Sequence, residues 1–233
     1  MPLLSMLSTI RAQTSVTNPY LTLTYVGTVQ GDATTTLTHP AGVQAGDVCI
    51  LFLFGYDNDG EEFLSTNRPS SFTHIMTTPD VNDIQTSITV SYGVLSSTSS
   101  LSFSQPGMDA YGHVAFYYRI SDGTLDSVIT LPGGTTYATG SSTNTISIPA
   151  VDSKISYLSF IGSASNADGT NHVSDMLIQR FNSAGATLDA LGTFSIGVGQ
   201  GPVSVGSAQA IGYGSTRLIH LIGGRLGFVK AEA

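Results

Sequence analysis

The stretch Ala45-Gly46-Asp47-Val48-Cys49-Ile50-Leu51-Phe52-Leu53-Phe54-Gly55-Tyr56-Asp57-Asn58-Asp59-Gly60 decides the fold. Seven consecutive apolar residues, Val48 to Phe54, stand between a Gly-Asp turn and an Asp/Asn/Gly turn. The run is too short to span a bilayer, which needs about 20 residues, and its β-branched and aromatic content favours a strand. Because this strand has no polar face, both of its sides must be covered. We therefore predict that it is the central strand of a β-sandwich.

Shorter segments on both sides of this run alternate apolar and polar residues, as half-buried strands do. The clearest alternation places Ile88, Val90, Tyr92 and Val94 on one face of a strand and hydroxyl residues and Gly93 on the other. Similar patterns occur near residues 21–25, 34–38, 112–120, 146–148, 155–161, 194–198, 203–205 and 218–222. About nine to eleven strands at roughly even spacing, with no convincing long helix, predict an all-β antiparallel sandwich of jelly-roll type.

Three further segments complete the expected organisation. Residues 133–144, which begin with Gly133-Gly134, are predicted to form a surface loop. The glycine-rich residues 197–201 lack the spacing of a dinucleotide-binding motif, so they are interpreted as a kinked strand or a bulge. Residues 174–181 fit a strand or a short helix, and we favour the strand. Residues 1–20 are interpreted as an N-terminal arm and residues 21–233 as one sandwich domain.

The composition excludes several classes of function. Of the 233 residues only 10% are charged, against a usual share of about 25%, and the formal net charge is −8. Nucleic-acid binding needs many cations, but the only lysines are Lys154 and Lys230, so no nucleic-acid partner is expected. The N-terminus has no cation before Arg11, which argues against a secretory signal and favours a docking arm that packs on a neighbouring subunit, and no membrane partner is expected. The single cysteine, Cys49, is predicted to be a small buried hydrophobe.

No strong catalytic motif is present, and no cofactor is expected. The chain has no Gly-x-Ser-x-Gly elbow, no Walker loop and no His-Glu-x-x-His motif, and its five histidines lack metal-ligand spacing. Asp57, Asp59, Glu61 and Glu62 form the one carboxylate cluster. An EF-hand would place glycine sixth in the loop, whereas Gly60 is fourth. A calcium site of another kind at Asp57, Asp59 and Glu61 stays open, although a solvated hairpin tip is the favoured interpretation.

Tyrosines offer the other candidate site. Tyr56, Tyr111 and Tyr137 could form a ligand or partner surface, for example for a glycan, and Tyr117 and Tyr118 could extend it. More commonly, tyrosines in strands are amphipathic residues at the edge of a core. A glycosidase would need two acids that converge in a cleft lined by aromatic residues, and the absence of tryptophan argues against this activity.

A series of short motifs resembles a β-sandwich domain that is common in phage virion proteins. Pro40-Ala41-Gly42-Val43-Gln44-Ala45-Gly46-Asp47 before an apolar strand resembles the start of that series, and Pro69-Ser70-Ser71-Phe72-Thr73 matches its Pro-x-x-Phe/Trp-Thr segment. An alternating strand follows at 86–94, and then a strand that ends in Tyr118-Arg119 before a turn. The segment at 145–150 matches the Ser/Thr-Ile-x-x-Pro element, and the segment at 176–180 resembles the Met-x-x-Arg element with one extra residue between Met176 and Arg180. The matches run in order over residues 21–222.

The resemblance implies a non-enzymatic virion structural protein without catalytic residues. On this basis we expect a protein that decorates or stabilises the capsid surface or forms a short head fibre, with the arm at residues 1–20 as its anchor. Its partners would be the major capsid protein or tail proteins, and a homotrimer is the favoured oligomer. The alternative is a receptor-binding or glycan-binding adhesin module at the tail. In both cases the protein would be part of a virion assembled in the host cytoplasm.

Overall fold

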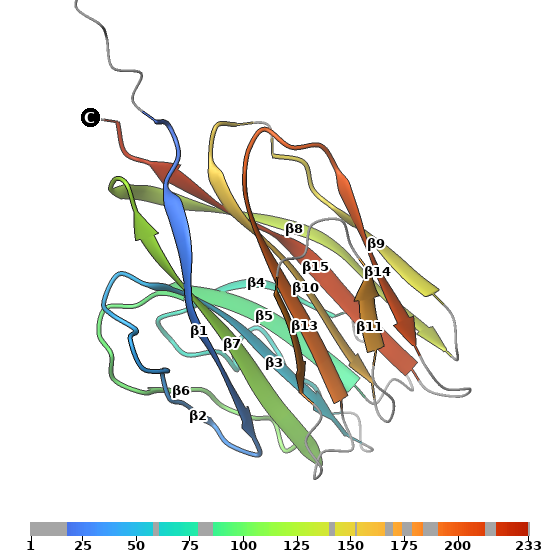
Figure 1. Ribbon diagram of the computed structural model, residues 1–233. Coiled ribbons are helices and arrows are strands. Elements are labelled where there is room, and N and C mark those ends of the chain that lie inside the picture. Colours follow the sequence, from blue (N-terminus) through green and yellow to red (C-terminus); the bar gives the residue numbers. More distant parts are fainter. Residues whose placement is uncertain are drawn as a thin grey trace, which may run out of the picture.

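Antiparallel strands make up the regular structure of the described chain (Figure 1). The computed structural model describes residues 18–57, 61–78, 86–139, 143–151, 153–165, 170–173, 179–183, 191–212 and 218–232. These residues form fifteen strands, two of them only two residues long, and no helix that could cross a membrane. The predicted all-β antiparallel sandwich is confirmed, with more strands than the sequence indicated. The strand order does not establish the jelly-roll type.

Two five-stranded sheets form the sandwich, and a smaller sheet adds a third layer (Figure 1). In spatial order, the first sheet contains β1 (Thr22–Asp32), β7 (Ala110–Ser121), β3 (Val48–Tyr56), β5 (Thr86–Val94) and β4 (Thr73–Thr77). The second contains β12 (Gln179–Ser183), β13 (Leu191–Gln200), β10 (Ser156–Ser165), β15 (Leu218–Lys230) and β8 (Leu125–Thr139). The third contains β11 (Thr170–Val173), β14 (Gly206–Gly212) and β9 (Thr143–Ile148), and β2 (Thr36–Leu37) pairs with β6 (Leu101–Ser102).

The apolar run lies where the sequence predicts it. Strand β3 is the middle strand of the first sheet, between β7 and β5, and residues Val48 to Phe54 are completely buried. Its side chains alternate between two separate clusters. Those at even positions face the second sheet, and those at odd positions face the outer side of the first sheet, where β2, β6 and loops cover them. Both faces of this apolar strand therefore contribute side chains to a hydrophobic cluster.

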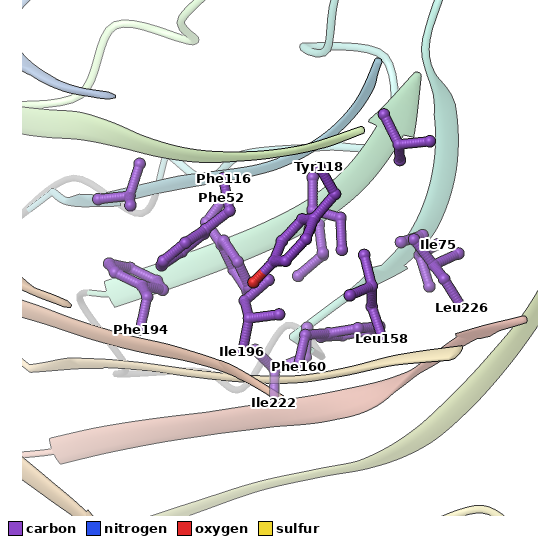
Figure 2. Close-up of a cluster of buried hydrophobic side chains, with 14 of the residues drawn as sticks. Phe52, Ile75, Phe116, Tyr118, Leu158, Phe160, Phe194, Ile196, Ile222 and Leu226 are labelled. Atoms are coloured by element: carbon purple, nitrogen blue, oxygen red, sulfur yellow. The ribbon is translucent and has the colours of Figure 1, made fainter. Parts of the chain in front are cut away.

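The core between the two large sheets is aromatic and aliphatic (Figure 2). Phe52 lies at its centre, with ring centroids 6.1 Å from Phe116 of its own sheet and 6.1 Å and 4.8 Å from Phe160 and Phe194 of the facing sheet. Residues from Leu21 to Phe228 contribute to this cluster, so the first and last strands share one core.

The segment that begins with Gly133-Gly134 is not a loop, which corrects the sequence prediction. Residues 133–139 continue β8, and residues 143–148 form β9, whereas residues 140–142 lie outside the described chain. The glycines allow the third sheet to pack closely on the second. A Cβ atom at Gly133 would lie 2.7 Å from the Ser147 carbonyl oxygen of β9, and one at Gly223 would lie 2.7 Å from Ile146 Cδ1 of β9. These glycines leave room for neighbouring strands, although a pair of glycines in the sequence suggested a turn.

Two other segments were given specific predictions: the bulge near 197–201, and a strand over 174–181. Residues 197–200 belong to β13, whose pairing with β10 runs without a register shift, so the predicted bulge there is wrong. Of the segment 174–181, residues 179–181 belong to β12, and residues 174–178 lie outside the described part of the chain.

Candidate functional site

The acidic segment after β3 closes its own loop. Asp57 is buried, with 3% of its surface exposed, and its Oδ2 atom accepts a hydrogen bond from the Glu61 backbone N–H at 2.8 Å. Glu61 is exposed and Glu62 is half-buried, and Asp59 lies outside the described residues. A buried carboxylate that accepts a backbone N–H four residues later has a structural role, because it ties the chain after β3 to the end of that strand.

The metal prediction gains no support from this geometry. Within the described ranges, no group of three or more His, Cys, Asp or Glu side chains could hold a metal ion. Asp57 and Glu61 do lie close together, but the contact between them is made by the carboxylate of one and the backbone of the other.

The candidate tyrosines lie toward one end of the sandwich, on different strands. Tyr56 ends β3, and Tyr111 lies on the adjacent β7, opposite Gly55. Tyr137 lies on β8 of the second sheet, opposite His220. The Tyr111 ring is half-buried and packs edge-on against buried Phe63 at 6.5 Å, as a core-edge tyrosine does. The side chains of Tyr56 and Tyr137 lie outside the described part.

The other two tyrosines are interior residues. Tyr117 and Tyr118 are fully buried on opposite faces of β7, and burial raises the pKa of both hydroxyls well above the usual range. Neither is available to a ligand, so the extension of the candidate surface to these two residues is wrong.

Tyr117 links the buried cysteine to a histidine. Nε2 of His39 lies 3.0 Å from the Ser99 carbonyl oxygen, which can only accept, so Nε2 carries the proton in the neutral ring. Nδ1 then accepts from the Tyr117 hydroxyl at 2.9 Å. The Cys49 thiol is hydrogen-bonded to the same hydroxyl, and burial raises the thiol pKa well above its usual range. Cys49 is completely buried, as predicted, and is a protonated, unreactive group.

Two further histidines are buried. His113 on the outer face of the first sheet is 2% exposed, and burial lowers its pKa to about 4. His220 on the second sheet is 1% exposed, and burial lowers its pKa to about 4 as well. Both rings are therefore neutral at pH 7. His113 lies in β7 and His220 in β15.

An ion pair that the sequence analysis missed joins two of the motif segments. The Arg119 guanidinium donates to both carboxylate oxygens of Asp47, at 2.9 Å each, and to the Gly42 carbonyl oxygen at 2.7 Å. Asp47 is 2% exposed and also accepts the Gln44 backbone N–H at 2.8 Å. Hydrogen bonding to Asp47 raises the pKa of Arg119. The pair fastens the turn before β3 to the end of β7, 72 residues later.

A buried arginine on the second sheet was also missed. Arg225 of β15 is completely buried, and its Nε atom donates to Ser159 Oγ at 3.0 Å. Nη1 donates to the carbonyl oxygens of Pro149 and Ser204, and the guanidinium lies 5.0 Å from the Tyr157 ring centroid. It therefore holds the connections that follow β9 and β13 against the outer face of the second sheet. An arginine within an apolar strand pattern was the only signal for it in the sequence.

The chain enters and leaves the sandwich at the same end (Figure 1). The Lys230 ammonium at the end of β15 donates to the Asn18 carbonyl oxygen at 2.8 Å, and the Tyr20 hydroxyl donates to the Gly201 carbonyl oxygen. Beside these contacts lies a cavity of about 550 Å³, which we call the terminal pocket. It is lined by Asn18, Pro19, Lys154, Val229, Lys230, Ala231 and Glu232.

Comparison with known proteins identifies no relative: no family model, no curated protein and no solved structure matches this chain.

Proposed function

We propose that this chain is a non-enzymatic structural protein of a phage virion, which decorates or stabilises the capsid surface or forms a short head fibre. The major capsid protein or a tail protein would be its partner, and a homotrimer is the favoured assembly. The proposal rests on the ordered series of motifs that resembles virion β-sandwich domains.

The observation that supports this use of the motifs is the contact between Asp47 and Arg119. These residues come from two separate motif segments, and their side chains meet in a bidentate pair. A third segment also has a structural role, because Arg68 donates through Nε to the Phe72 carbonyl oxygen at 2.6 Å. The pairing of β3 with β7 places the two residues of the bidentate pair side by side, since Val48 lies opposite Tyr118, so both motif segments contribute to the fold of one domain.

The proposal is tested by locating the protein in purified particles. Cryo-electron microscopy of intact virions should show density of this domain's size at the capsid surface, and antibody labelling should decorate the head. Particles that lack the protein entirely would refute the virion role.

The proposed anchor is tested by truncation. Deleting residues 1–17 keeps Asn18 and Tyr20, whose contacts hold the chain to the sandwich. The truncated protein should fold and remain soluble but no longer bind particles. A truncated protein that binds particles as well as the full chain would show that the anchor lies elsewhere.

The alternative of a tail adhesin has one point in its favour, which is that Tyr56, Tyr111 and Tyr137 lie toward one end of the sandwich. Binding to a glycan array that is lost in Tyr56→Ala or Tyr137→Ala variants would favour the adhesin over passive decoration. Tyr111→Ala is a weaker test, because it also removes packing against Phe63.

A further inference from the structure

The terminal pocket gathers positive charge in an acidic protein. Lys154 and Lys230 are the only lysines of the chain, and both line this pocket. Glu232 is the one carboxylate among its described lining residues, so two positive charges face one negative charge. The described lining of the pocket therefore carries a net positive charge, in a chain whose formal net charge is −8.

The two ammonium groups have no carboxylate partner among the described residues. Among the described residues the ion pair is the one between Asp47 and Arg119, away from the pocket, and no described carboxylate oxygen lies within 4.0 Å of either lysine. Lys230 is nevertheless held in place. Its aliphatic stem lies over Gly123, where an added Cβ atom would come within 2.4 Å of Lys230 Cε, and its Nζ atom donates to the Asn18 carbonyl oxygen. An ammonium has three hydrogens, so Lys230 keeps donors for a ligand.

The size and lining of the pocket indicate the class of ligand. A volume of about 550 Å³ lies within the usual range of about 300–1,000 Å³ for ligand sites, and it exceeds what one small anion needs. Pro19, Val229 and Ala231 supply apolar wall between the charged groups. This combination suits aspartate and glutamate side chains, which have a carboxylate on a short aliphatic stem.

We propose that the terminal pocket binds an acidic peptide segment of a partner protein, with its carboxylates on Lys154 and Lys230. The inference deepens the proposed virion role and rests on it for the partner's identity, since the pocket lies where the chain enters the sandwich. A contact there would position the domain on its partner next to the arm.

The test uses the full chain with ¹⁵N-labelled lysine, which gives only two backbone amide signals, assigned with Lys154→Arg and Lys230→Arg variants. The probe is tetraglutamate, acetylated at its N-terminus and amidated at its C-terminus. Both signals should shift saturably with this peptide and stay in place with the matching tetraglutamine peptide. Equal shifts with both peptides, or no saturable shift, would overturn the proposal.

Affinities of variants are measured by the fluorescence anisotropy of dye-labelled tetraglutamate at low salt. Replacing both lysines with glutamine should weaken binding by about tenfold, because two exposed charge pairs are lost. The double arginine variant is the matched control and should retain binding, and Glu232→Gln should tighten it. Unchanged affinity in the double glutamine variant would refute the site, provided that its thermal unfolding matches the parent protein. Complete displacement of the peptide by millimolar inorganic phosphate would identify a general anion site and overturn the peptide assignment.

The outcomes separate this inference from the virion proposal. If tetraglutamate does not bind but the protein is found in particles, the pocket inference fails and the virion role stands. If tetraglutamate binds as expected but particles lack the protein, the virion role fails and the pocket remains an acidic-peptide site.

Discussion

The two faces of the first sheet are both buried but are built differently. The inner face packs against the second sheet through a large cluster of buried hydrophobic residues. The second sheet adds one buried histidine on this side, His220, which pairs with inward-facing Ala164. The outer face is covered by β2, β6 and loops, and polar side chains stand among its apolar residues. They include the chain from Cys49 through Tyr117 to His39, the Asp47–Arg119 pair and the neutral ring of His113.

The difference follows from what covers each face. A sheet satisfies its own backbone hydrogen bonds, so it can cover a core with apolar side chains alone. Loops bring carbonyl and N–H groups that need partners, and the polar side chains of the outer face supply some of them, as Asp47 does for Gln44 and His39 for Ser99. Sheet-to-sheet packing therefore rests on shape, whereas loop-to-sheet packing also rests on hydrogen bonds.

The largest expected effect is a cavity in the inner face. Phe52→Ala removes a ring that contacts three other phenylalanines, and it should lower the free energy of unfolding by about 3–5 kcal/mol. Urea denaturation followed by circular dichroism measures this loss. Leu51→Ala is the matched change on the outer face of the same strand. If Leu51→Ala costs more than Phe52→Ala, the inner face is not the main source of stability.

Acid should destabilise the protein through its buried histidines. The folded pKa of His113 and of His220 is lowered to about 4, from 6.5 in the unfolded chain. The unfolded state therefore binds more protons, so the stability that these groups contribute is present above pH 6.5 and is lost as the pH falls toward 4. Each full loss amounts to about 3 kcal/mol. Urea midpoints measured between pH 7.5 and 4 should fall steeply below pH 6.5.

A variant separates this effect from the general titration of carboxylates. His113→Gln keeps a polar side chain on the outer face but removes the titrating ring, so its midpoint should depend less on pH than that of the parent protein. Parallel pH profiles for the two proteins would show that His113 does not contribute.

A smaller effect is expected from the ion pair of the outer face. Asp47→Asn keeps the shape of the side chain but removes its charge and one acceptor site for Arg119. The urea midpoint should fall by less than in Phe52→Ala, and the difference from the parent protein should shrink at high salt, because salt screens a partly exposed pair. Arg119→Lys, which loses the bidentate geometry but keeps the charge, should give part of this loss. A larger loss for Asp47→Asn than for Phe52→Ala would reverse the order of the two faces.

The smallest effect on stability is expected at Cys49. Its thiol makes one weak hydrogen bond, so Cys49→Ala should cost about 1 kcal/mol. The sharper measurement is chemical, because a thiol reagent should modify the native protein only at the rate of global unfolding. Rapid labelling in native conditions would show that the covering of the outer face opens easily.

The sequence predicted the inner face better than the outer one, for a physical reason. Unbroken apolar residues and strict alternation indicate strands, and both Val48 to Phe54 and the strand at 86–94 form as expected. The alternation at 86–94 was wrong about exposure, because its hydroxyl face, Ser87, Thr89 and Ser91, is also buried, under the covering of the outer face. The Asp47–Arg119 pair joins residues far apart in the chain, and local periodicity carries no information about such contacts. The loop predicted from Gly133 onward was wrong, because a glycine permits both a turn and a close approach between two strands. Asp57 was expected in a solvated hairpin tip, but it is buried, and that burial depends on three-dimensional packing that the local sequence does not report.

The position of the two chain ends also has a mechanical consequence. Asn18 and Lys230 touch at one end of the sandwich, and β1 lies at the edge of the first sheet whereas β15 lies inside the second. A force that pulls these ends apart acts perpendicular to the strands. It would therefore peel β1 from the sheet and break its hydrogen bonds one after another. A force applied between that end and the opposite one would load many hydrogen bonds in shear at the same time. Single-molecule pulling along the two directions should therefore give a low unfolding force for the first and a higher one for the second.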